Sequence, residues 1–138
     1  MSVVIDTTRV APRAKRRICV DFDLTLVDWG PLYEVPEPLP GAVEAVRTLV
    51  ERGYEVVILT SRLSRTWWAE HCIDSGMDPE SFGRGQRAIV EESLSRMGLG
   101  GVRVTAEKVP ALAYIDDRAI AFGGDWREVL RTIPEVQR

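Results

Sequence analysis

Two carboxylates lie close together in the segment Asp21-Phe22-Asp23, directly after the apolar run Arg17–Val20. Side chains alternate along an extended chain, so Asp21 and Asp23 are expected to point the same way. Two unit charges of like sign at about 4 Å repel by ~4 kcal/mol at an effective dielectric constant of about 20. The pair therefore predicts a bound cation or a shared proton, either of which would relieve the repulsion.

Further polar residues gather around two other apolar runs, Tyr54–Leu59 and Leu112–Ile115. They follow the runs directly or, for the lysine, precede the second one: Thr60, Ser61, Arg62, Asp116, Asp117, Arg118 and Lys108. Hydroxyl and guanidinium groups suit a phosphate. Carboxylate oxygens suit Mg²⁺ better than zinc. His71 is the single histidine of the chain, which argues against a zinc site or a histidine-based catalytic triad.

Bulk composition indicates an ordinary globular domain. The chain has 138 residues, 45% of them hydrophobic and 28% charged, with a net charge of −3. This length suits one domain with one core. No apolar run approaches the ~20 residues of a membrane helix, and no secretory pattern is present, so we expect a cytoplasmic protein without membrane contact. Cys19 and Cys72 are expected to be free thiols.

The elements that would position these side chains alternate along the chain. Apolar runs predict strands at Arg17–Val20, Tyr54–Leu59, Val102–Thr105 and Leu112–Ile115. Helical spacing and caps predict helices at Gly41–Arg52, Ser64–Ser75, Gln86–Met97 and after Asp125, with a turn or short helix at Asp78-Pro79. This order predicts a single α/β Rossmann-like domain with a mostly parallel sheet and helices on both faces. Chemistry is then expected at the carboxyl ends of the strands.

The domain is expected to span residues 17–138. Residues 1–16 form a basic segment that we expect to be a solvated tail, with nucleic-acid binding as the alternative. Val3–Ile5 could form an edge strand within it. The four prolines between residues 27 and 40 predict a loop or small flap after the first strand.

The polar clusters carry a resemblance to a known family. DFDLT, beginning at Asp21, resembles the DxDxT signature of the haloacid dehalogenase (HAD) superfamily. ILTSR resembles its second motif, Lys108 the third, and YIDD the acidic fourth. The four motifs occur in the order of the family and span residues 18–118.

This resemblance implies roles for individual residues. Asp21 would be the nucleophile that forms an aspartyl-phosphate, and Asp23 the general acid. Thr60 would hold the phosphoryl oxygens, and Lys108 would neutralise charge on Asp21 and the phosphate.

The resemblance also implies a metal site and a subclass. Asp21, the backbone carbonyl of Asp23 and the acidic pair would hold Mg²⁺, with Asp117 favoured over Asp116 as the direct ligand. Thr25 matches the phosphatase form of the first motif, and a leaving halide would not need the acid at Asp23. A phosphatase is therefore expected rather than a dehalogenase.

The spacing of the motifs leaves room for a minimal cap or none, which implies an open site. Such a site suits bulky substrates or closure by a second subunit in a homodimer. The IDDR segment is similar to the phosphatase half of phage polynucleotide kinase and to 5′(3′)-deoxyribonucleotidases, which implies a nucleotide or nucleic-acid end phosphate. Arginines that could clamp a second phosphate, and aromatic residues that could stack on a base, are Arg62, Arg65, Arg118, Trp29 and Tyr33. For the arginines, surface salt bridges are an equal alternative.

Two other functions stay open at this point. A catalytically silent HAD-fold binding module would keep the fold without turnover. A HAD phosphotransferase would use the same aspartyl-phosphate but would need a site that excludes water.

Overall fold

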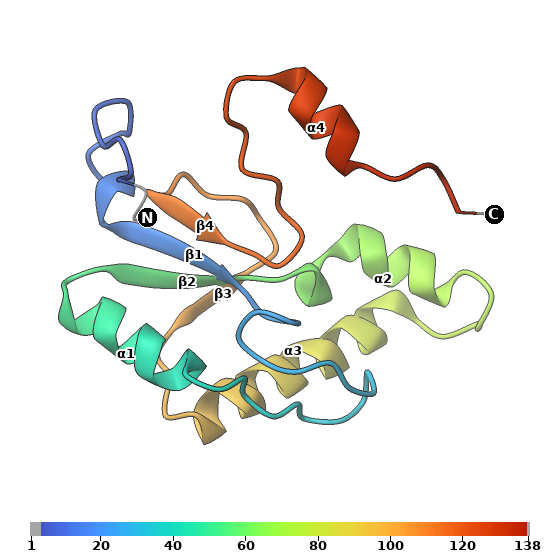
Figure 1. Ribbon diagram of the computed structural model, residues 1–138. Coiled ribbons are helices and arrows are strands. Elements are labelled where there is room, and N and C mark those ends of the chain that lie inside the picture. Colours follow the sequence, from blue (N-terminus) through green and yellow to red (C-terminus); the bar gives the residue numbers. More distant parts are fainter. Residues whose placement is uncertain (1–3, 138) are drawn as a thin grey trace.

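The computed structural model describes residues 4–137, which build one parallel sheet with helices packed against it (Figure 1). The strand order is β3-β2-β1-β4, and every neighbouring pair is parallel. The strands are β1 (Arg17–Asp21), β2 (Glu55–Leu59), β3 (Arg103–Thr105) and β4 (Ala113–Ile115). The α/β fold with a parallel sheet, expected from the alternation of elements, is confirmed.

The helices begin where capping residues predict them. They are α1 (Ala42–Glu51), α2 (Arg65–Cys72), α3 (Pro79–Arg96) and α4 (Trp126–Thr132), with short 3₁₀ turns η1 (Ala14–Arg16) and η2 (Ser61–Leu63). Ser64 caps α2 through Trp67 N–H, and Asp78 caps α3 through Ser81 N–H. α3 thus begins at Pro79 and runs through the predicted start at Gln86, because a capping Asp and a Pro in the first turn favour initiation there.

The main core lies between one face of the sheet and two helices. Ile18 and Val20 of β1 alternate with residues of the opposite face and lie beside Val56 and Ile58 of β2. Their cover comes from α1 and α3. The buried side chains these helices contribute are Val46, Val90 and Leu94. Burial of such side chains stabilises by roughly 1.5–3 kcal/mol each.

The other face of the sheet is crossed by residues 106–112. β3 and β4 form opposite edges of the sheet, so the segment that joins them must pass over β2 and β1. Arg17 Nη1 donates to the carbonyl of Pro110 (2.9 Å) in this segment. Cys19 of β1 and Val57 of β2 are buried on this face.

No helix of the described residues seals this second face, so the expected helical cover on both faces is corrected to one. α4 has no buried residue, and its Trp126 is 69% exposed. Figure 1 shows α4, in red, at the end of an extended segment and apart from the sheet. Its apolar periodicity predicted the helix correctly but could not specify what covers it.

The N-terminal segment forms no strand over residues 4–16, and only its end is packed against the rest of the protein. Val4 and Ile5 belong to no strand, and Val3 lies outside the described residues. Ala14 of η1 is buried, so the end of the basic segment belongs to the fold.

Cys19 and Cys72 are buried free thiols, as predicted. Within residues 4–137, no helix has both the length and the apolar character required to cross a bilayer.

Candidate functional site

Asp21 lies at the carboxyl end of a central strand. β1 has hydrogen-bonded neighbours on both sides, which fixes the backbone that carries this carboxylate. Phe22 N–H donates to Asp21 Oδ1 (2.8 Å), which orients the group further. A side chain held in this way is well placed for chemistry at the edge where parallel strands end.

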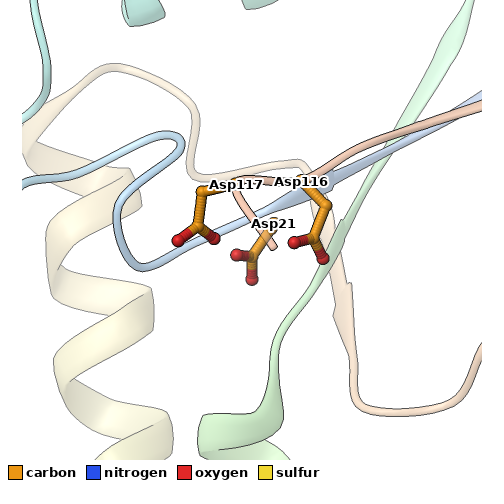
Figure 2. Close-up of side chains that lie close together, drawn as sticks. All are labelled: Asp21, Asp116 and Asp117. Atoms are coloured by element: carbon orange, nitrogen blue, oxygen red, sulfur yellow. The ribbon is translucent and has the colours of Figure 1, made fainter. Parts of the chain in front are cut away.

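Asp116 and Asp117 follow β4 and meet Asp21 at this edge. One carboxylate oxygen from each residue lies within 4.8 Å of the others. Figure 2 shows the acidic pair on either side of Asp21, with all three carboxylates directed to a common region. Thr25 Oγ1 lies 3.5 Å from both Asp21 Oδ2 and Asp117 Oδ1. These three residues each follow an apolar run in the sequence, and that placement predicted the cluster.

The surroundings of Asp21 disfavour its charge. Burial is the largest cause, followed by the hydrogen bond with Asp117 and by repulsion from Asp116 and Asp117, and together they raise the pKa of Asp21 to about 7. The Phe22 N–H opposes this and lowers the pKa. A carboxylate that resists ionisation beside two others is a site that a cation would stabilise.

The donor set fits Mg²⁺. The three converging groups are hard carboxylate oxygens, and two of the three residues, Asp116 and Asp117, are exposed, which leaves room for the waters that Mg²⁺ usually keeps. Asp23 does not join this cluster through its side chain, although the sequence placed it beside Asp21.

The Asp23 carboxylate instead forms a two-pronged ion pair with Arg62. Arg62 Nη2 donates to Oδ1 (2.8 Å) and Nε to Oδ2 (2.9 Å). Arg62 is only 3% exposed, and its guanidinium also lies over the ring of Phe22. The repulsion expected between Asp21 and Asp23 is therefore relieved at Asp23 by an arginine. Arg62, expected to bind substrate phosphate, has its guanidinium engaged by the protein.

Gln86 completes the environment of Arg62 and is not among the site residues predicted from the sequence. It is fully buried in α3, and its Oε1 accepts from Arg62 Nη1 (3.2 Å). The available signal was its position one turn before Val90 on the apolar side of the helix, where a polar residue needs a buried partner.

Thr60 and Ser61 take different positions at the end of β2. Thr60 is buried, and its Oγ1 accepts from Arg62 N–H (3.1 Å), so it caps η2. A hydroxyl that accepts in this way can still donate its own hydrogen. Ser61 is exposed and lines the cavity beside Asp21.

Lys108 lies away from Asp21. Its Nζ sits 4.8 Å from the centre of the Tyr114 ring, on the segment that crosses the sheet. In the described part of the chain it forms no ion pair with any carboxylate. The structure thus does not bring the expected third-motif lysine into the cluster.

A cavity of about 280 Å³ opens over the acidic cluster. Its polar lining includes Arg118, which is exposed and whose backbone N–H donates to Asp116 Oδ1 (2.7 Å). The rest of the lining is apolar or aromatic. The lining residues are Asp21, Asp23, Leu24, Trp29, Leu32, Ser61, Arg62, Trp67, Asp117 and Arg118. A larger cavity of about 530 Å³ lies around Arg47 and Tyr54 and holds none of the clustered carboxylates, so we place the candidate site in the smaller one.

Trp29 and Tyr33, the aromatic residues expected to face a base, separate in the structure. Trp29 lines the cavity, whereas Tyr33 packs edge-on against Phe82. Trp67 takes the second aromatic place in the cavity, while its neighbour Trp68 is buried and donates to the carbonyl of Arg62 (2.7 Å). Arg65, the third arginine considered for phosphate, pairs with Glu80 at the surface.

Neither a protein-family model nor a curated protein matches this chain. Among solved structures, the chain is similar to a conserved protein from Bacteroides thetaiotaomicron, with 19% identity and a TM-score of 0.49. That likeness covers 83% of this chain and 86% of the other. A likeness at this level carries no argument about function, which therefore depends on the residues of the site.

Proposed function

We propose that this chain is a Mg²⁺-dependent phosphomonoester hydrolase that works through an aspartyl-phosphate on Asp21. The observation that carries the proposal is the convergence of Asp21, Asp116 and Asp117 from two strand ends, beside a cavity that Asp21 and Asp117 line. The order of the four HAD-like motifs in the sequence supports the same reaction.

Asp21 is the proposed nucleophile. Its Oδ1 is held by Phe22 N–H, which leaves Oδ2 to attack the phosphorus atom. The new bond joins Oδ2 to phosphorus while the bond to the leaving oxygen breaks and that oxygen takes a proton. Water then attacks the phosphorus atom and gives a proton back to Asp23, the bond between Oδ2 and phosphorus breaks, and inorganic phosphate leaves with the Asp21 carboxylate restored.

Asp23 is the proposed general acid. Both of its oxygens accept from Arg62 in the resting arrangement. A protonated Asp23 would keep one oxygen for Arg62 and offer the O–H on the other to the leaving group. Arg62 would therefore orient the acid.

The metal would be held by the carboxylates of Asp21, Asp117 and Asp116. When bound, Mg²⁺ would neutralise their charge and orient the phosphate. Arg118, exposed on the cavity, is the cation best placed to contact a phosphate oxygen, since Arg62 is engaged by Asp23. Thr60 could donate its hydroxyl hydrogen to a phosphate oxygen while it still accepts from Arg62 N–H. Lys108 would need to leave the ring of Tyr114 to take part directly.

The proposed substrate is a nucleotide or a nucleic-acid end phosphate. Trp29, Leu32 and Trp67 form an apolar wall of the cavity. A base can stack on an exposed aromatic ring with a gain of roughly 1–3 kcal/mol. The spacing of the motifs, which leaves room for a minimal cap or none, suits a bulky leaving group, and closure by a second copy in a homodimer stays part of the proposal.

Phosphate release with Mg²⁺ tests the proposal. The panel is an aryl phosphate, 5′ and 3′ nucleotides and a 3′-phosphorylated oligonucleotide, with Asp21→Asn beside the wild type. Release by the wild type alone, abolished by chelator, is the expected result. Transfer of phosphate to an added alcohol in place of water would indicate a phosphotransferase. No release from any ester would favour a binding module that lacks turnover.

A further inference from the structure

A buried amide connects the candidate acid to the wall of the cavity. Gln86 is 0% exposed, so both polar atoms of its side chain need partners inside the protein. Oε1 accepts from Arg62 Nη1 (3.2 Å), and Nε2 donates to the carbonyl of Leu32 (3.1 Å). One side chain on α3 therefore contacts two separate parts of the site.

The first arm of this connection is the hydrogen bond from Arg62 to Gln86, and it leads through Arg62 to Asp23. Three nitrogens of Arg62 are engaged, two by the Asp23 carboxylate and Nη1 by Gln86. A guanidinium is a rigid planar fork, so fixing Nη1 fixes the direction of the other two donors. Without Gln86, Nη1 would lose its acceptor and the fork could turn away from Asp23.

The second arm ends in the proline-rich loop. This loop is fastened at its two ends by backbone bonds, Asp28 N–H to the carbonyl of Glu37 (2.8 Å) and Leu39 N–H to the carbonyl of Leu26 (2.9 Å). Leu32 lies between these ends and is bonded to α3 through Gln86. Trp29 and Leu32 both line the cavity, so the bond holds the apolar wall in place.

We propose that Gln86 is a positioning residue that fixes the general acid and the substrate-facing loop together. It is not among the residues that line the cavity, and it acts through Arg62 and the Leu32 carbonyl. This inference rests on the proposed function, because it assigns the two arms to proton transfer and to substrate binding.

Two substitutions separate the effect of the hydrogen bond to Arg62 from that of the hydrogen bond to Leu32. Gln86→Met keeps the approximate volume and removes both hydrogen bonds. Gln86→Glu keeps an oxygen that accepts from Arg62 but removes the amide donor toward Leu32. Ser93→Ala is the control, because Ser93 is buried on the same helix and its hydroxyl has no hydrogen-bond partner among the described residues.

Steady-state kinetics on aryl phosphates with good and poor leaving groups is the first measurement. Gln86→Met should lower kcat by about tenfold or more on the poor leaving group and much less on the good one, because only the former needs the proton of Asp23. Gln86→Glu should restore that kcat but keep a KM raised by about fivefold, as expected for one lost hydrogen bond to the wall. Equal losses on both leaving groups, or no rescue by Gln86→Glu, would overturn the proposal.

Hydrogen exchange of the loop backbone tests the connection without turnover. Exchange at residues 29–35 should accelerate in Gln86→Met and Gln86→Glu and stay unchanged in Ser93→Ala. If Gln86→Met does not fold, Gln86→Glu carries the test alone through its raised KM and its faster loop exchange. If the wild type hydrolyses no ester, the proposed function fails, whereas unchanged loop exchange in the variants would refute the positioning role itself.

Discussion

At the residue scale, the charge of Asp21 opposes folding when no cation is present. Burial and its acidic neighbours raise the pKa of Asp21 from 3.8 to about 7. The native state then holds a proton that the unfolded chain has lost, so the stability contributed by this group falls as pH rises from about 3.8 to about 7. In chelator, we expect the Tm of the wild type to be lower at pH 8 than at pH 5.

Asp21→Asn should remove most of this pH dependence and raise the Tm in chelator at pH 8. Asp74→Asn, at an exposed carboxylate outside the cluster, is the matched control and should follow the wild type. Mg²⁺ should raise the Tm of the wild type, and at 100 times its Kd it should add about 2.7 kcal/mol to the free energy of unfolding. The rise in Tm should be smaller for Asp21→Asn. Scanning calorimetry at the two pH values measures both effects. If the pH dependence of the Tm were unchanged in Asp21→Asn, Asp21 would not be its source.

Arg62 and Arg65 both pair with a carboxylate but differ in burial. Arg62 is 3% exposed in its pair with Asp23, whereas Arg65 is 78% exposed in its pair with Glu80. Arg62→Met leaves the half-buried Asp23 without its counter-charge and should cost ~3 kcal/mol of unfolding free energy. Arg65→Met should cost under ~1 kcal/mol, because solvent screens the pair. Urea unfolding of the two variants makes the comparison, and equal costs would show that the buried pair contributes little.

At the scale of elements, the packing of α3 on α2 depends on one glycine. A Cβ built on Gly83 would lie 2.5 Å from the ring of Trp68, whereas one on Gly85 would meet no atom of the described residues within 4 Å. Gly83→Ala should therefore destabilise by roughly 1–3 kcal/mol through overpacking. Gly85→Ala should stabilise by roughly 0.5–1 kcal/mol, because Ala has the higher helix propensity. Urea unfolding measures the free energy of unfolding of both variants. Changes of the same sign in the two variants would contradict the close packing of Gly83 against Trp68.

The elements could be predicted because apolar runs and capping residues are local signals. The four strands and the start of α2 at Ser64 follow from such signals. The start of α3 was placed too late, since Gly83 and Gly85 lower helix propensity, and only the contact with Trp68 reveals why a glycine is required.

Part of the candidate site could also be predicted, because it depends on where the predicted strands end. The rule that parallel strands end at one edge brings Asp21 together with Asp116 and Asp117. The pairing of Asp23 with Arg62 could not be derived, because it depends on how η2 turns the chain after β2. The position of Lys108 depends on the path of residues 106–112 over the sheet, which no local pattern encodes.

At the scale of the whole molecule, stability is concentrated between residues 14 and 99. Among residues 4–137, the buried apolar side chains all lie within this range. None of residues 121–137 is buried, and Trp126, Leu130 and Ile133 of the α4 region are exposed. The fold and the candidate site therefore depend little on the last segment of the chain.

Deletion of residues 121–138 should accordingly change the free energy of unfolding by less than ~1 kcal/mol, as is usual for exposed positions. Phosphate release should also persist, because the deletion retains Asp116, Asp117 and Arg118. Leu94→Ala, which empties a buried position on α3, should cost ~2–5 kcal/mol and calibrates the urea measurement. A loss from the deletion as large as that of Leu94→Ala would mean that α4 covers the second face of the sheet in solution. That result would restore the helical layer on both faces that the sequence predicted.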